Sequence, residues 1–165
     1  MLQLKPISPD GIPEALEKAV RYRLLNEPRL AESICLDILE IDPENQEAII
    51  TLLLSKTDQF GSSASADVAD ARQFLSRLHS AYDQFYYGGI ICERQAKAIL
   101  TKDLTGGDFM AYEWLMDAME LFEKAEAIRP PNKDDSILHW NTCVRMITRN
   151  HLHPRQEDFI EPPLE

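Results

Sequence analysis

Two short segments place the strongest limit on the fold of this chain of 165 residues, because each contains a break between helical patterns. The first, LEIDPENQEA, covers residues 39–48, and the second, AEAIRPPNKDD, covers residues 125–135. Proline interrupts a helix and pushes the residue before it out of the helical region. Each segment is therefore expected to join the end of one helix to the start of the next.

Apolar residues recur at intervals of three and four through most of the chain, which is typical of amphipathic helices. This spacing predicts seven helices, over residues 13–26, 28–41, 45–59, 66–84, 86–103 and 108–129, with the seventh beginning after Pro131 and ending near Asn150. No segment shows the sustained alternation of a strand. We therefore expect an all-α fold.

The connections between these helices carry recognisable signals. Residues 61–67 are small and polar and predict a loop, after which Ser65 or Asp67 could cap the next helix. Gly88 and Gly89 could end one helix, or could lie inside the start of another where a backbone must approach closely. We favour a helix that begins at about residue 86.

Residues 12–45 form a unit of about 34 residues that resembles a tetratricopeptide repeat (TPR). The matching positions are small residues, one aromatic residue and a closing proline, namely Ala19, Tyr22, Ala31 and Pro43. Two positions depart from the family, because Ala15 stands in place of a tryptophan and Cys35 in place of a large aromatic residue. The second-helix spacing of the family recurs at Ala118, Phe122, Ala125 and Pro130.

The two closing prolines are too far apart for two standard repeats. Pro43 and Pro130 are 130 − 43 = 87 residues apart, whereas two repeats span about 68. We place the extra residues in the loop at 61–67 and in longer fourth, fifth and sixth helices, which leaves a degenerate middle repeat. A helical bundle that imitates the spacing is the alternative.

The resemblance implies a right-handed superhelix of antiparallel helix pairs, with three TPR-like repeats and a capping helix. It divides the chain into an N-terminal arm at residues 1–11, a helical-repeat domain at 12–150 and an acidic, proline-rich tail at 151–165.

The composition argues against several classes of partner. A formal net charge of −11 disfavours nucleic acid, whose phosphates require a surplus of lysine and arginine. Neither a signal-peptide core nor a run of about 18–20 apolar residues is present, so no membrane partner is expected. Three widely spaced cysteines without a CxxC pair suit reduced thiols. We therefore expect a cytoplasmic protein.

The sequence also lacks motifs for catalysis. No nucleophile motif, phosphate loop or paired-carboxylate signature is present, so we expect no enzyme activity and no cofactor. His139 and Cys143 stand one helical turn apart, and His151 and His153 lie in the tail, which offers metal-ligand types. We interpret the first two as core residues and the others as solvated, and expect no metal site.

TPR arrays generally bind a protein or peptide in a concave groove that the first helix of each pair lines. By this resemblance the groove residues are Leu16, Val20, Arg23, Ile50, Leu54, Glu93, Arg94, Lys97, Asn141 and Arg145. Residues 61–104 contain five acidic and five basic side chains, so the middle of this acidic chain is neutral. If Arg94 and Lys97 join Arg145 in the groove, an acidic segment or a carboxylate terminus could dock there. Alternatively, the basic residues form ordinary ion pairs with Glu93, Glu113 or Asp135.

These observations favour a non-catalytic scaffold that binds a protein or peptide in a TPR groove. The alternative function is a structural or assembly protein that forms a homodimer or larger homo-oligomer through its helix faces. Repeat arrays without a polar cap expose apolar edges, which can pair with a second copy.

Overall fold

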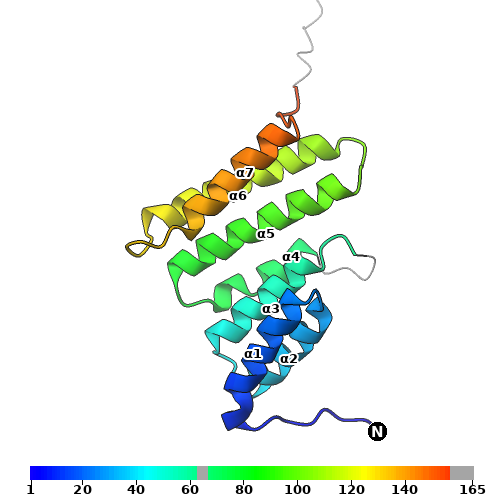
Figure 1. Ribbon diagram of the computed structural model, residues 1–165, viewed down its shortest axis with the longest axis vertical. Helices are drawn as coiled ribbons and strands as arrows, with labels where there is room; N and C mark the ends of the chain where they lie inside the picture. The colour runs from blue at the N-terminus through cyan, green and yellow to red at the C-terminus, as the bar shows by residue number, and fades with distance from the viewer. Residues whose placement is uncertain (63–66, 157–165) are drawn as a thin grey trace, which may run out of the picture.

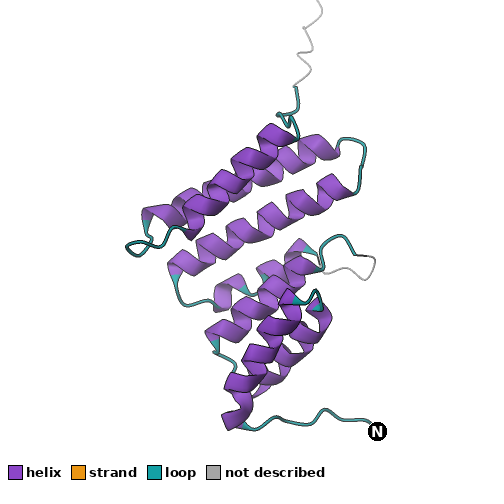
Figure 2. Ribbon diagram, viewed as in Figure 1, coloured by secondary structure: helices purple, strands orange, loops and turns teal. Residues whose placement is uncertain are grey.

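The computed structural model describes residues 1–62 and 67–156 of the protein. Figure 2 shows helices joined by loops, and neither range contains a strand. The prediction of an all-α fold is confirmed. Among the helices in these two ranges, none combines the length and the apolar character that crossing a membrane requires.

The helices begin where the sequence provides a suitable first turn or cap. Pro13 and Pro28 occupy first-turn positions, where a missing N–H has no cost. Asn45 caps its helix because its side-chain oxygen accepts a hydrogen bond from the Ala48 N–H at 3.0 Å. The elements are α1 (Ile12–Leu24), α2 (Pro28–Ile41), α3 (Gln46–Asp58), α4 (Val68–Arg72), α5 (Ala81–Thr101), α6 (Gly107–Ala127) and α7 (Asp135–Arg149), with 3₁₀ turns η1 (Pro9–Gly11) and η2 (Leu75–Arg77).

The helices pack as consecutive pairs in two layers (Figure 1). In one layer α1, α3, α5 and α7 contact one another in chain order. In the other, α2 packs against α1 and α3, α4 against α3 and α5, and α6 against α5 and α7. The first layer therefore brings side chains from the whole length of the described chain onto one continuous face.

The prediction of a single helix over residues 66–84 is wrong. Asp67 and Asp70 form a capping box that begins α4, and this short helix ends at Arg72. After η2, Leu78 adopts an extended conformation, and the Ser80 hydroxyl caps α5 by accepting a bond from the Asp83 N–H at 3.2 Å. The fourth helix is thus shorter than expected, while α5 and α6 each have 21 residues. Asp67 is confirmed as a cap, whereas Ser65 lies outside the described residues.

Gly88 and Gly89 lie inside α5, so the prediction of a helix that begins at about 86 is also wrong. Both glycines are buried against α6. A Cβ atom on Gly89 would lie 2.5 Å from Cε1 of the Phe122 ring. The two glycines therefore allow α5 and α6 to approach closely, as expected for glycines inside a helix, although this helix begins at Ala81.

The buried residues form two clusters that meet in the middle of the molecule. The N-terminal cluster comes mainly from α1 to α4, and the C-terminal cluster from α5 to α7. Leu54 of α3 and Tyr87 of α5 contact both clusters. At the TPR-like positions the small residues Ala19, Ala31, Ala118 and Ala125 and the aromatic Phe122 are fully buried, whereas the aromatic Tyr22 is only half-buried.

The first residues after α7 pack against the helical body. Leu152 is buried in the C-terminal cluster. The Phe109 ring of α6 contacts the His153 ring. The Arg155 guanidinium lies 5.6 Å from the centre of the Phe109 ring. The expected tail at 151–165 therefore starts with docked residues, and residues 157–165 lie outside the described chain.

Candidate functional site

Two adjoining hollows on the face of α1, α3, α5 and α7 form a continuous depression, which we call the basic groove. The first hollow has a volume of about 470 Å³ and is lined by the C-terminal ends of α1 and α3 and by α5. The second has a volume of about 610 Å³ and lies between α5 and α7. The hollows share Arg94, Lys97 and Thr101 of α5, so they are continuous.

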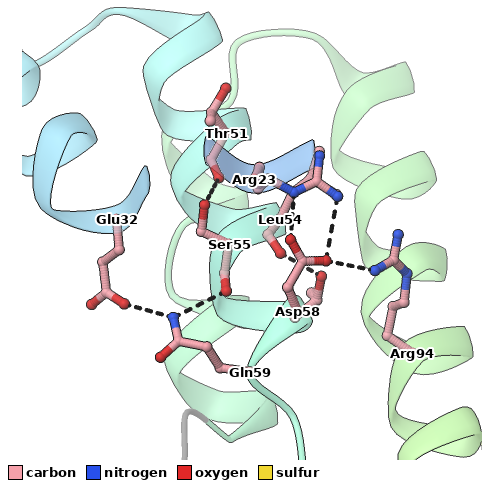
Figure 3. A network of polar contacts seen from close by, with 9 residues as sticks. Arg23, Glu32, Thr51, Leu54, Ser55, Asp58, Gln59 and Arg94 are labelled. Carbon is pink, nitrogen blue, oxygen red and sulfur yellow. Dashed lines mark hydrogen bonds and ion pairs between the residues drawn. The ribbon is translucent and has the colours of Figure 1, made fainter. Parts of the chain in front are cut away.

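A shared carboxylate fixes the first hollow. Asp58 Oδ2 accepts a hydrogen bond from Arg23 Nε at 2.6 Å, and Asp58 Oδ1 accepts one from Arg94 Nη1 at 2.7 Å (Figure 3). The Asp58 side chain is only 16% exposed, which strengthens these contacts. A carboxylate at the C-terminal end of α3 opposes the helix dipole, and the two guanidinium groups compensate for it. This trio ties α1, α3 and α5 together and retains one positive charge.

A second polar network joins α2 to α3 beside this site (Figure 3). Glu32 accepts hydrogen bonds from Lys56 Nζ at 2.6 Å and from Gln59 Nε2 at 2.8 Å. Partial burial would raise the pKa of the Glu32 carboxyl, but the bonds from Lys56 and Gln59 outweigh it, and the pKa is lowered. The network holds the end of α3 in place, so that Asp58 is positioned from both sides.

The second hollow has a buried acidic residue at its base. The Glu93 side chain is 8% exposed, and its Oε1 atom lies 3.0 Å from His139 Nδ1 and accepts a hydrogen bond from the Cys143 thiol at 3.8 Å. The His139 ring also packs against the Tyr86 and Phe122 rings. This arrangement joins α5 to α7 through the core. Within the described ranges no group of three or more histidine, cysteine, aspartate or glutamate side chains could hold a metal ion.

A separate hollow lies on α1, and we call it the apolar hollow. It has a volume of about 500 Å³ and is lined by Pro13, Leu16, Val20 and Leu24 of α1, with Glu17, Arg21 and Glu47 at its edges. Val20 is 43% exposed and Leu24 is 79% exposed. Apolar side chains this exposed at the edge of a hollow mark a candidate contact surface.

The groove residues expected from the sequence are distributed over three places. Leu16 and Val20 lie in the apolar hollow, whereas Ile50 and Leu54 are half-buried and pack against the core clusters. The basic groove contains Arg23, Glu93, Arg94 and Lys97. Asn141 and Arg145 line neither of its hollows.

On α7 the groove is instead lined by Thr142, Met146 and Arg149, which follow helical spacing. Adjacent positions on a helix differ by about 100°, so an assignment displaced by one residue places a side chain on another face. Sequence reasoning also missed Asp58. An aspartate in the last turn of a helix is unfavourable for the helix dipole, and this was the available signal that a cation lies nearby.

The three cysteines are free and buried. Burial raises the pKa of the Cys35 thiol to about 12, and it also raises the pKa of Cys92 and, together with the neighbouring Glu93, that of Cys143. The thiolate is the reactive form of cysteine. None of the three therefore has the properties of a nucleophile.

We predict that DTNB at pH 8 will react with these thiols at least about a thousandfold more slowly in the native protein than in denaturant. DTNB can reach a buried thiol only when the surrounding structure unfolds locally or globally. Native proteins of ordinary stability populate such unfolded states rarely. The measurement is thiol release followed by absorbance. Rapid release of one equivalent from the native protein would contradict the burial of at least one cysteine.

Comparison of the chain with protein-family models, with curated proteins and with solved structures found no match. The resemblance to TPR proteins rests on the residues of this sequence and stays a prediction.

Proposed function

We propose that the protein is a non-catalytic interaction domain that binds an acidic segment of another protein in the basic groove. The observation that carries this proposal is the gathering of Arg23, Arg94, Lys97 and Arg149 around one depression of a chain whose formal net charge is −11. A right-handed TPR-like superhelix and a cytoplasmic setting belong to the same proposal.

The charges of the groove leave donors for a ligand. Arg23 and Arg94 share the single Asp58 carboxylate, and each guanidinium has five N–H groups, so donors remain on both. In the described ranges Lys97 and Arg149 form no ion pair. Positive side chains that are concentrated in a depression focus the field on an anionic partner. Carboxylates of a peptide are the matching groups, because guanidinium binds them in a planar, two-point geometry.

The dimensions of the groove suit side chains of a peptide. Volumes of about 470 and 610 Å³ fall within the range of about 300–1,000 Å³ that is typical of ligand sites. Apolar contacts are also available, since Phe60 lies in the first hollow and Leu100 and Met146 in the second. An acidic segment that also carries an apolar side chain therefore fits this surface best.

Selection from a random peptide-display library tests the proposed ligand chemistry without assuming a partner. We expect aspartate and glutamate to be enriched among the peptides that wild-type protein retains. Enrichment of basic peptides, or recovery of no binder, would overturn the proposal.

A selected acidic peptide should bind at least about 10-fold more weakly to a Lys97→Ala, Arg149→Ala double variant, because even one lost hydrogen bond to a charged group contributes about 1.5–3 kcal/mol. The affinity of wild type should also fall as salt is added, since exposed charges are screened over about 8–10 Å. Fluorescence anisotropy at two salt concentrations measures both effects.

The matched control is a Lys18→Ala, Lys124→Ala double variant. It removes the same charge from exposed lysines that line neither hollow of the basic groove. Its affinity should stay within about twofold of wild type, because distant surface charges contribute little. Equal weakening in both double variants would show that only overall charge matters, and the groove would lose its assigned role.

A further inference from the structure

The N-terminal arm carries apolar side chains that contact nothing in the described chain. Leu2 is fully exposed and Leu4 is 93% exposed. The arm is attached at Ile7, which packs against the N-terminal cluster, and residues 1–5 extend away from the body (Figure 1). Two leucines this exposed on an extended segment are available to contact another surface.

The same chain offers an apolar surface that no residue of the described ranges covers. This is the apolar hollow, in which Val20 and Leu24 of α1 remain exposed. The arm starts on a different side of α1, because Ile7 lies beside Ala15 and Lys18, whereas the hollow is formed by Leu16, Val20 and Leu24. In a helix with 3.6 residues per turn, the side that carries Ala15 and Lys18 and the side that carries the hollow are more than a third of the circumference apart. The root of the arm is therefore directed away from the hollow of its own chain.

The two surfaces match in length and in charge. Five extended residues span about 17 Å, and the hollow follows α1 from Pro13 to Leu24, which is also about 17 Å. Glu17 and Glu47 stand at the edges of the hollow with only Arg21 as a cation, and the arm carries Lys5 after its leucines. The arm thus supplies the apolar groups and the positive charge that the hollow lacks.

We infer that two copies of this chain form a symmetric dimer by exchanging arms, with Leu2 and Leu4 of each copy seated in the apolar hollow of the other. The contact is self-complementary, as a twofold axis requires, and two arms bury 2 × 2 = 4 leucine side chains. Lys5 lies against Glu17 and Glu47 of the other copy. The basic groove stays open in this dimer, because its hollows share only Leu24 with the apolar hollow.

Analytical ultracentrifugation of the full chain over a wide concentration range tests the exchange. Wild type should reach a dimer, and Leu2→Asp, Leu4→Asp should raise the dissociation constant by at least about a hundredfold, since each buried leucine contributes roughly one to two powers of ten. Val20→Glu should have a similar effect. The matched control Leu36→Asp changes a leucine that is 52% exposed on α2, outside the hollow, and should leave the dimer unchanged.

Mixing the two variants distinguishes arm exchange from any other dimer. The arm variant retains an intact hollow and Val20→Glu retains an intact arm, so their heterodimer regains one correct contact that neither homodimer has. We expect the mixture to associate more tightly than either variant alone. Circular dichroism should confirm that both variants remain folded, and Lys5→Glu paired with Glu17→Lys provides a second complementary set that keeps the leucines.

Three results would overturn the inference. Wild type that remains monomeric at all concentrations would exclude the exchange, as would a dimer that survives the arm variant. A mixture that associates no better than its components would show that arm and hollow do not meet. Peptide binding in the basic groove would be unaffected by any of these results, so the two proposals fail independently.

Discussion

Gly89→Ala should be less stable than Gly88→Ala by about 1–3 kcal/mol, although the two positions are adjacent in the same helix. A Cβ atom at Gly89 would lie 2.5 to 2.8 Å from three atoms of the Phe122 ring, which is fully buried and cannot move aside. At Gly88 the nearest atom is Leu121 Cδ1 at 3.4 Å, the end of a side chain that is only partly buried.

Helix propensity does not contribute to this difference, because exchanging glycine for alanine gains the same amount, about 1 kcal/mol, at both positions. Urea and thermal unfolding measure the effect, and about 3–10 °C should separate the two melting temperatures. Phe122→Leu in the Gly89→Ala background should recover part of the loss, since neighbouring substitutions are coupled. Equal melts for the two alanine variants would mean that α5 and α6 are further apart than described.

Ala118→Trp should lower the free energy of unfolding by about 3 kcal/mol, which corresponds to about 6–12 °C in melting temperature. Ala118 is fully buried in the C-terminal cluster between α6 and its neighbours, so an indole ring has no space there. Met116→Trp is the matched control on the same helix, because Met116 is 43% exposed.

The same comparison applies to the N-terminal half. Ala31 is fully buried and Leu30, its neighbour on α2, is 45% exposed. Ala31→Trp should therefore be severely destabilising and Leu30→Trp nearly neutral. If both buried-alanine variants melted like wild type, the close helix contacts at these positions would be disproved.

Local signals in the sequence were sufficient for the helices that have a clear start. Prolines in the first turn of α1 and α2, and the break at Pro43 before α3, gave bounds that agree with the structure to within about two residues at most ends. The region from 66 to 84 failed for a physical reason. Apolar residues such as Leu75, Leu78 and Tyr82 keep helical spacing even though the chain bends at Leu78 and restarts at Ser80.

The candidate site was less accessible from the sequence, because it depends on how helices rotate about their axes. Arg23 and Arg94 were expected on the same face, but the carboxylate between them is on α3, and no local pattern links residues 23, 58 and 94. On α7 an error of one position exchanged Asn141 and Arg145 for Thr142 and Met146. Helix faces are fixed by tertiary packing, which a single sequence specifies only indirectly.

The short length of α4 has a mechanical consequence for the basic groove, which lies on the layer formed by α1, α3, α5 and α7. With five residues, α4 fills the layer behind α3 and α5 much less completely than α2 and α6 fill theirs, with 14 and 21 residues. Local opening is easiest where few buried contacts join two parts, so we expect the molecule to bend most readily between its two core clusters. The Asp58 trio crosses this joint on the groove side. Bending there would stretch the Arg94–Asp58 pair, whereas Arg23 and Asp58 would move together because both belong to the N-terminal half.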